Sequence, residues 1–349
     1  MTYSKNKKHK KDRFAPKLKS ISPLEHLERL SPLKRLALML EYKRPAHSRF
    51  IQYFVDDIIE PMVSRAGYRL EHDAAGNCFV RVGASRVLWS SHTDTVHSEA
   101  GFQKIAISGD LLKVAHSEQG SSSCLGADCT TGVWLMLEMI TAHVSGLYVF
   151  HASEEVGGLG SSHIAKHTPE LLEGISFAIA FDRKGKSSII THQGGFRTCS
   201  DAFAHSLAGA LPLGFCLDDG GTFTDTANYA EGLLPECTNI SVGYEGAHTK
   251  TETQSVSFAL ALREALLSFD EALLVEARDK DEQEELWSRY GAFGSGFRSS
   301  YSGGSGWLDY DDLEAFVYAN PERVSEFLLE QGFSLDDLIQ APRYLTKGA

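Results

Sequence analysis

The sequence has no apolar run of the ~18 residues that a membrane-spanning helix needs, so we expect no membrane segment. Its N-terminus is positively charged, but no apolar segment follows, and this is not the pattern of a secretory signal. The six cysteines are scattered along a chain that is long enough to bury a large core without disulfides. These features predict reduced thiols and a cytoplasmic protein.

Positive charge is scarce outside one short segment. The chain has 34 Lys and Arg against 46 Asp and Glu, which gives a net charge of −12. Residues 1–20 contain eight Lys or Arg and one Asp, so the other 329 residues carry about −19. A body this acidic repels phosphate, and we expect no nucleic-acid partner. We interpret residues 1–20 as a disordered basic tail, with a specific anionic partner as the alternative.

The hydrophobic pattern changes its period along the chain. Apolar residues recur at three- and four-residue spacing over 33–42 and 48–67, which predicts two helices. Short apolar runs then predict strands at 68–70, 78–82, 87–90, 147–151, 177–181 and 238–242. Helical patterns at 133–140, from 161 and over 256–277 lie among them. This alternation predicts an α/β fold with a mostly parallel central sheet flanked by helices.

The composition changes again after the last of these helical patterns. Residues 278–285 are nearly all charged, and 11 of the 16 residues in 291–306 are Gly or Ser. We therefore predict a catalytic domain over 21–277, a polar linker over 278–306 and a small helical appendage over 307–349.

Side chains of the kinds that bind metals follow several of the predicted strands. In an open α/β sheet, ligands gather beyond the carboxyl ends of the strands, so these side chains can converge without disturbing the core. One of them, an aspartate, instead opens the helix at 133–140. In chain order, the residues are His92 with Asp94, Asp128, Glu154 with Glu155, Asp182 and His248.

The charges of this set favour bound cations. Asp128, Glu155 and Asp182 would repel one another, and their pKa values would rise, if nothing compensated them. Two divalent cations and one hydroxide would neutralise the three carboxylates, with His92 and His248 as neutral donors. The mixture of imidazole and carboxylate suits Zn²⁺, with Co²⁺ or Mn²⁺ as alternatives.

In type and order, these motifs resemble those of the di-zinc (co-catalytic) exopeptidase superfamily of aminopeptidases, tripeptidases and carboxypeptidases or deacylases. The resemblance extends from about residue 88 to residue 252. Each motif alone is common by chance, whereas all of them in this order make a specific pattern. The resemblance implies the zinc-exopeptidase fold and two divalent metal ions per chain.

The resemblance also implies how the metal ligands divide between the two ions. Asp128 would bridge both ions. His92 and Asp182 would complete one coordination sphere, and Glu155 and His248 the other.

The resemblance further assigns the general base of the reaction and a residue that orients one of the metal ligands. Glu154 would be the general base that takes a proton from a water shared by the two metals, and Asp94 would orient His92. The resulting metal-bridged hydroxide would attack the scissile carbonyl. One residue departs from the superfamily pattern, because the position after the bridging aspartate is often acidic or an amide and here is Cys129. We interpret Cys124 and Cys129 as small buried thiols.

Three further residues are weaker candidates. His192 follows a predicted strand, and Asp225 lies in an acidic, turn-rich segment, so both are candidates for substrate contact. For Asp225 the alternative is a solvated acidic loop, and for His192 a structural role. Glu252 either positions the loop that carries His248 or caps the helix that follows it.

The spacing of the motifs also bears on the choice of activity. Asp182 and His248 are only 66 residues apart, so no inserted lid domain fits between them. This favours an aminopeptidase-like exopeptidase acting on small peptides. The alternatives are an amidohydrolase acting on N-acyl amino acids with the same metals, and a non-catalytic binding protein on the same fold. Oligomerisation is left open.

Overall fold

A computed structural model describes residues 29–118 and 122–280, together with the single positions Leu27, Gly120, Val324 and Leu328. The predicted basic tail over 1–20 lies outside the described residues. So do most of the predicted linker and almost all of the predicted appendage over 307–349.

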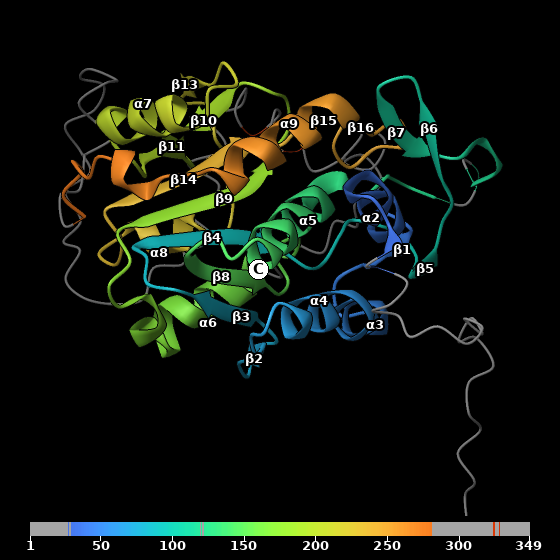
Figure 1. Ribbon diagram of the computed structural model, residues 1–349, viewed down its shortest axis with the longest axis horizontal. Coiled ribbons are helices and arrows are strands. Elements are labelled where there is room, and N and C mark those ends of the chain that lie inside the picture. Colours follow the sequence, from blue (N-terminus) through green and yellow to red (C-terminus); the bar gives the residue numbers. More distant parts are fainter. Residues whose placement is uncertain are drawn as a thin grey trace, which may run out of the picture.

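An eight-stranded sheet forms the centre of the molecule (Figure 1). Its four middle strands, β14, β9, β4 and β8, run parallel to one another, and antiparallel neighbours border them on both sides. The predicted α/β fold with a mostly parallel sheet is therefore confirmed. In spatial order the strands are β13 (Cys216–Asp218), β10 (Ser188–Ile190), β14 (Glu236–Ser241), β9 (Phe177–Arg183), β4 (Val87–His92), β8 (Gly146–His151), β3 (Cys78–Val82) and β2 (Glu71–His72).

The middle strands are apolar because both of their faces are covered. Every residue of β4, β8 and β14 is buried. Side chains alternate between two hydrophobic clusters, so that Trp89 joins one face and its neighbour Leu88 joins the other. On the first face the rings of Trp89 and Phe181 stack with their centroids 5.6 Å apart.

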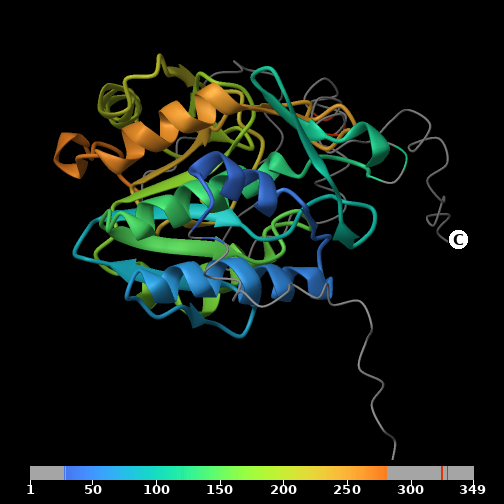
Figure 2. The ribbon, with the colours of Figure 1, turned by 45° about the vertical axis from the view of Figure 1, so that its right-hand side comes forward.

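Helices cover both faces of the sheet. On one face α5 lies against the middle strands, with α2, α4 and α9 around it (Figure 2). The other face is covered by α6 and α8. The helices of these two layers are α2 (Pro32–Met39), α4 (Glu60–Arg65), α5 (Ala127–Thr141), α6 (Leu159–His167), α8 (Ala227–Ala230) and α9 (Val256–Leu267).

Further helices lie at the margins of the sheet. The segment α3 continues through a π-helical turn, Val55–Ile59, into α4, and this run ends before Gly67 as predicted. These marginal helices are α3 (Arg49–Phe54) and α7 (Asp201–Ala210). Within the described ranges, no helix is both long and apolar enough to cross a membrane.

Two predicted elements differ from the structure. No strand forms at 68–70, because the backbone N–H of Tyr68 bonds to the carbonyl of Val63 and closes the preceding helix. The predicted long helix over 256–277 ends at Leu267. Asp270 then caps a separate short 3₁₀ turn by accepting the N–H of Ala272, although the apolar spacing continues through this break.

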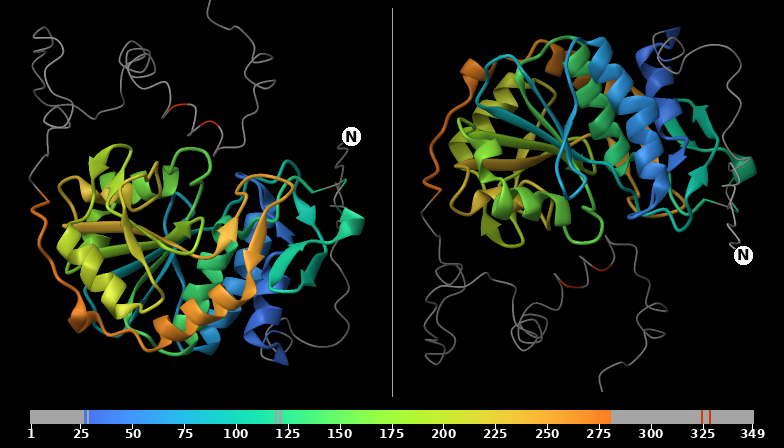
Figure 3. Two further views of the ribbon diagram at one scale, coloured as in Figure 1. Left: turned by 90° about the horizontal axis from the view of Figure 1, so that it is seen from above. Right: turned by 90° about the horizontal axis from the view of Figure 1, so that it is seen from below.

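A smaller four-stranded sheet stands at one end of the molecule (Figures 1 and 3). No lid domain separates Asp182 from His248, because that interval is filled by strands of the central sheet, by α7 and α8, and by short hairpin strands. The strands of the smaller sheet, in spatial order, are β15 (Tyr244–Glu245), β16 (Thr253–Ser255), β7 (Leu111–Val114) and β6 (Ile105–Ser108). The remaining described strands pair as β1 (Tyr42–Lys43) with β5 (Gly101–Phe102) and β11 (His192–Gln193) with β12 (Phe196–Arg197).

Candidate metal centre

The predicted ligands converge at the carboxyl ends of the middle strands. His92 is the last residue of β4, Asp182 lies near the end of β9, and Glu155 follows β8. Asp128 lies in the first turn of α5, and His248 lies in the loop between β15 and β16. Parallel strands bring these positions to one edge of the sheet, although up to 156 residues of sequence separate them.

Asp128 lies between the two histidines. Its Oδ1 is 3.1 Å from Nε2 of His92, and its Oδ2 is 3.1 Å from Nε2 of His248. Each carboxylate oxygen therefore faces a different imidazole. Oδ2 also lies 3.1 Å from the hydroxyl of Tyr244.

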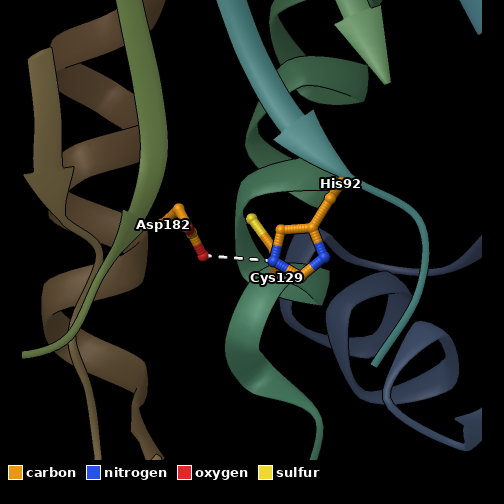
Figure 4. A group of neighbouring side chains, drawn as sticks. All are labelled: His92, Cys129 and Asp182. Atoms are coloured by element: carbon orange, nitrogen blue, oxygen red, sulfur yellow. Dashed lines mark hydrogen bonds and ion pairs between the residues drawn. The ribbon is translucent and has the colours of Figure 1, made fainter. Parts of the chain in front are cut away.

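Asp182 completes one half of the cluster. Its Oδ1 is 3.2 Å from Nε2 of His92, and its Oδ2 accepts a hydrogen bond of 2.7 Å from the hydroxyl of Thr224. Figure 4 shows His92, Cys129 and Asp182 pointing toward one another from β4, α5 and β9. The thiol of Cys129 lies 2.9 Å from the carbonyl of Phe181, to which it donates, and burial raises its pKa well above the ordinary range.

Glu155 completes the other half. Its Oε2 lies 3.5 Å from Nε2 of His248, whereas Oε2 of its neighbour Glu154 lies 3.9 Å from Nε2 of His92. The carboxylate of Asp94 fixes this pair by accepting the N–H of Glu154 at 3.1 Å and that of Glu155 at 3.2 Å. Nδ1 of His92 is closer to the backbone carbonyl of Asp94, at 3.1 Å, than to its carboxylate, at 3.5 Å.

Burial sets the protonation behaviour of the cluster. It raises the pKa of Glu154 and of Glu155 well above the ordinary range, and neighbouring carboxylates raise both further. Burial also raises the pKa of Asp182 to about 6, with the charge of Asp128 as a further cause. Asp128 behaves differently, because hydrogen bonds from His248 and His92 outweigh burial and hold its pKa well below the usual value.

The donor set fits divalent cations. Three groups each have ligand atoms within 4.8 Å of one another: His92, Cys129 and Asp182; His92, Glu154 and Glu155; and Asp128, Glu155 and His248. Oε1 of Glu155 is buried and has no hydrogen-bond partner among the described residues. Such an atom costs about 1–3 kcal/mol unless a donor or a cation faces it. Imidazole nitrogens beside carboxylate oxygens are suitable ligands for Zn²⁺, Co²⁺ or Mn²⁺.

Glu252 holds the segment that carries Asp128. Its carboxylate accepts the backbone N–H groups of residues 125–128 at 2.8, 2.9, 2.9 and 3.3 Å. The sequence offered two roles for Glu252, positioning of the His248 loop or capping of the following helix. Glu252 lies in the same loop as His248, so these bonds attach that loop to the N-terminus of α5, whereas Ser255 caps α9 by accepting the N–H of Phe258.

Arg44 is a second supporting residue, and nothing in the sequence singled it out. Its fully buried guanidinium donates to the carbonyl of Thr93 and to the hydroxyl of Thr130, each at 2.8 Å, and lies 3.7 Å above the ring of Phe54. It therefore ties the segment between His92 and Asp94 to the first turn of α5. Burial lowers the pKa of Arg44 to about 9.

The two predicted substrate residues, His192 and Asp225, do not line the pocket that borders the metal cluster. Asp225 is buried, with Oδ2 at 3.4 Å from Nδ1 of His151, and burial raises its pKa to about 8. His192 places Nδ1 at 2.9 Å from the hydroxyl of Thr191.

All six cysteines lie in described parts of the chain and are free, and five of them, including Cys124 and Cys129, are buried. This arrangement agrees with the interpretation of small buried thiols.

The same arrangement of sheet and helices is found in solved structures described as a tripeptidase and as aminopeptidases. A tripeptidase from Staphylococcus aureus subsp. aureus Mu50 superposes with a TM-score of 0.58 at 14% identity, over 71% of this chain and 98% of its own. Aminopeptidase PepT from Bacillus cereus ATCC 10987 gives a TM-score of 0.56 at 13% identity, over 71% and 98%.

An archaeal enzyme has the same fold. Aminopeptidase APDkam598 from Desulfurococcus kamchatkensis gives a TM-score of 0.54 at 14% identity, over 69% of this chain and 95% of its own. Neither a protein-family model nor a curated protein sequence matches the chain. At these identities the likeness establishes the fold, and the chain combines that fold with a buried cluster of candidate metal ligands.

Proposed function

We propose that the protein is a metal-dependent exopeptidase that hydrolyses the N-terminal peptide bond of small peptides. One observation carries the proposal: the five ligand-type residues named above converge at one sheet edge beside Glu154. The three solved structures named above are described as a tripeptidase or an aminopeptidase, which supports this class of reaction.

Two divalent cations, preferably Zn²⁺, would be held by the cluster. Asp128 would bridge them, since its two oxygens face different imidazoles at 3.1 Å. His92 and Asp182 would hold one ion, and Glu155 and His248 the other. When bound, the ions would supply Lewis-acid polarisation of the scissile carbonyl and of a water molecule.

Glu154 would be the general base that takes a proton from the water molecule. It lines the pocket, and Asp94 fixes its backbone. Its carboxylate would accept that proton from the water molecule and pass it to the leaving amine. Asp94 would act as a positioning residue, because its carboxylate holds the N–H groups of both Glu154 and Glu155.

Two matched variants test this division of roles. Glu154→Gln keeps the shape of the side chain but removes the proton acceptor, so turnover should fall about 10²–10⁴-fold with metal content unchanged. Glu155→Gln should instead lower metal content, and added Zn²⁺ should restore part of the activity. Turnover of alanine tripeptides and metal content are measured on both proteins. Full activity of Glu154→Gln would refute the proposed mechanism, and metal loss in Glu154→Gln alone would reverse the two roles.

The choice of substrate separates the proposal from its alternatives. An amidohydrolase would use the same residues but would cleave N-acyl amino acids and leave free-amine peptides intact. A non-catalytic binding protein would cleave neither class, with or without a chelator. Hydrolysis of aminoacyl-anilides that a chelator abolishes and Zn²⁺ restores is the result expected for the exopeptidase.

A further inference from the structure

The pocket beside the acidic metal cluster is also lined by basic residues. Its volume is about 560 Å³ when the part open to solvent is included. Apart from the acidic residues and His248 of the cluster, its charged lining residues are Arg183 and Lys184. A ligand in this pocket is therefore surrounded by residues that include both the acidic cluster and two basic residues.

The local structure fixes both basic residues relative to the cluster. They directly follow Asp182, at the end of β9 and in the turn after it. Nη2 of Arg183 donates to the carbonyl of Gly220 at 3.3 Å and lies 3.5 Å from Oδ2 of Asp218. The backbone carbonyl of Lys184 accepts a hydrogen bond of 2.7 Å from the hydroxyl of Ser241.

The chemistry of a short peptide matches this distribution of charge. Its scissile bond must reach the cluster, and its free carboxylate must then lie elsewhere in a small pocket. A carboxylate is stabilised by lysine as a point charge and by arginine through charge-assisted, often bidentate hydrogen bonds. A pocket wall without charge would offer neither interaction.

We propose that Arg183 and Lys184 bind a carboxylate of the substrate, so that the substrates are short peptides with a free carboxylate near the scissile bond. The carboxylate is either the peptide's C-terminus or an acidic side chain. This inference rests on the proposed function, because it takes the scissile bond to lie at the cluster.

The test compares three substrates and three variants. The substrates are trialanine with a free C-terminus, trialanine amide and Glu-Ala-Ala amide. The variants Arg183→Met and Lys184→Met each remove one charge from the pocket. The control Lys186→Met removes the same charge from an exposed residue that does not line the pocket.

The wild-type protein should prefer a substrate with a carboxylate over trialanine amide by about 10- to 100-fold in kcat/KM, because a charge-assisted hydrogen bond contributes that much. Both pocket variants should lose most of this preference through a higher KM, and Lys186→Met should keep it. Preference for free trialanine identifies the C-terminus as the bound group, and preference for Glu-Ala-Ala amide identifies an acidic side chain. Equal kcat/KM for all three substrates would overturn the inference. A preference that neither pocket variant weakens would overturn it as well.

A binding measurement separates this inference from the proposed function. Calorimetry with metal-loaded Glu154→Gln protein compares the affinities of the same three peptides without turnover. Tighter binding of the carboxylate peptides that is lost in Lys184→Met on this background supports carboxylate binding by the two basic residues. This holds even if the wild-type protein hydrolyses none of the peptides. Equal affinities contradict the inference even if the protein proves to be a peptidase. Melting temperatures of all variants identify any that have lost the fold, and Lys184→Met keeps the test decisive if Arg183→Met is among them.

Discussion

Helix α5 carries two buried carboxylates, Asp128 and Glu138, and their surroundings differ in kind. Glu138 lies between two arginines, with Oε1 at 2.6 Å from Nε of Arg35 and Oε2 at 2.7 Å from Nε of Arg263. Asp128 instead faces the imidazoles of His92 and His248, and further carboxylates lie around it.

The difference between Asp128 and Glu138 shows which buried carboxylates indicate a metal site. The arginines around Glu138 provide more positive charge than it needs, so its ionised form requires nothing from outside the chain. Around Asp128 the described contacts come from imidazole and hydroxyl groups, and the neighbouring acidic side chains add negative charge. Burial of a carboxylate therefore does not by itself indicate a metal site. Burial of a carboxylate without sufficient positive charge from the chain does indicate one.

The largest effect on stability is expected at Glu138. Glu138→Gln removes the buried carboxylate that two half-buried arginines share, which should lower the free energy of unfolding by about 3–5 kcal/mol. The control is Glu264→Gln, which removes an exposed partner of the same Arg263 and should cost no more than about 1 kcal/mol. Denaturant unfolding measures both. Similar losses in the two variants would contradict the structural role assigned to the triad formed by Arg35, Glu138 and Arg263.

Removal of the carboxylate of Glu252 should act on the metal site. Glu252→Gln retains one acceptor oxygen for the four N–H groups of residues 125–128 and places an amide donor against the others. Because Asp128 would lose its support, metal affinity should fall about 10–100-fold. Zn²⁺ titration of this variant is compared with Glu245→Gln, an exposed glutamate on β15 that should bind normally. Unchanged affinity in Glu252→Gln, with a lower melting temperature, would mean that Glu252 only supports the fold.

The stability of the metal-free protein should depend on pH. Burial raises the pKa values of Asp182, Glu252 and Asp225 to about 6, 7 and 8, so the folded state keeps protons that the unfolded chain releases above pH ~4. Burial alone would lower the pKa values of His92 and His248, but the nearby carboxylates raise both overall. A raised histidine pKa also makes the stability of the folded state fall as the pH rises.

The melting temperature of chelator-treated protein should therefore fall as the pH rises from about 6.5 to 8, above the range in which the buried neutral His97 and His151 act in the opposite direction. Zn²⁺-loaded protein should show a smaller fall, because the bound cations replace the protons that are lost. Calorimetric scans of both forms across this range give the comparison. A melting temperature of the metal-free protein that rises toward pH 8 would show that the cluster does not carry excess negative charge.

The smallest effect is expected from the basic N-terminal segment. Deletion of residues 1–20 should leave the melting temperature and the turnover of small substrates nearly unchanged, because the segment has too little apolar content to join a core. Thermal unfolding and peptide turnover of the truncated protein test this expectation. A fall in melting temperature comparable to that of Glu138→Gln would show that the segment packs against the domain.

The fold and the candidate ligands could be predicted because both depend on local patterns. His92 and Asp182 end apolar strands, and parallel topology alone brings such positions to one edge. The support of the site depends instead on distant pairings. Glu252 reaches residues 125–128, and Arg44 reaches Thr93 and Thr130, through tertiary contacts that leave no periodic or motif signal in the sequence.

The wrong end of the last predicted helix came from local backbone chemistry that overrides apolar spacing. The helical pattern continues to residue 277, but the helix ends at Leu267 and Asp270 then caps a new turn. Asp225 and His192 were predicted from composition and position. The direction of a side chain relative to a pocket cannot be read from either of these features.

The most direct test of the central claim is a calorimetric Zn²⁺ titration of metal-stripped protein at about pH 7.5. The wild-type protein and Glu138→Gln should each bind two ions per chain, because the carboxylate of Glu138 is already compensated by Arg35 and Arg263. Asp128→Asn should bind at most one ion, and weakly, because the bridging charge is lost. A wild-type protein that binds no Zn²⁺, or an Asp128→Asn variant that still binds two ions with wild-type affinity, would contradict the account.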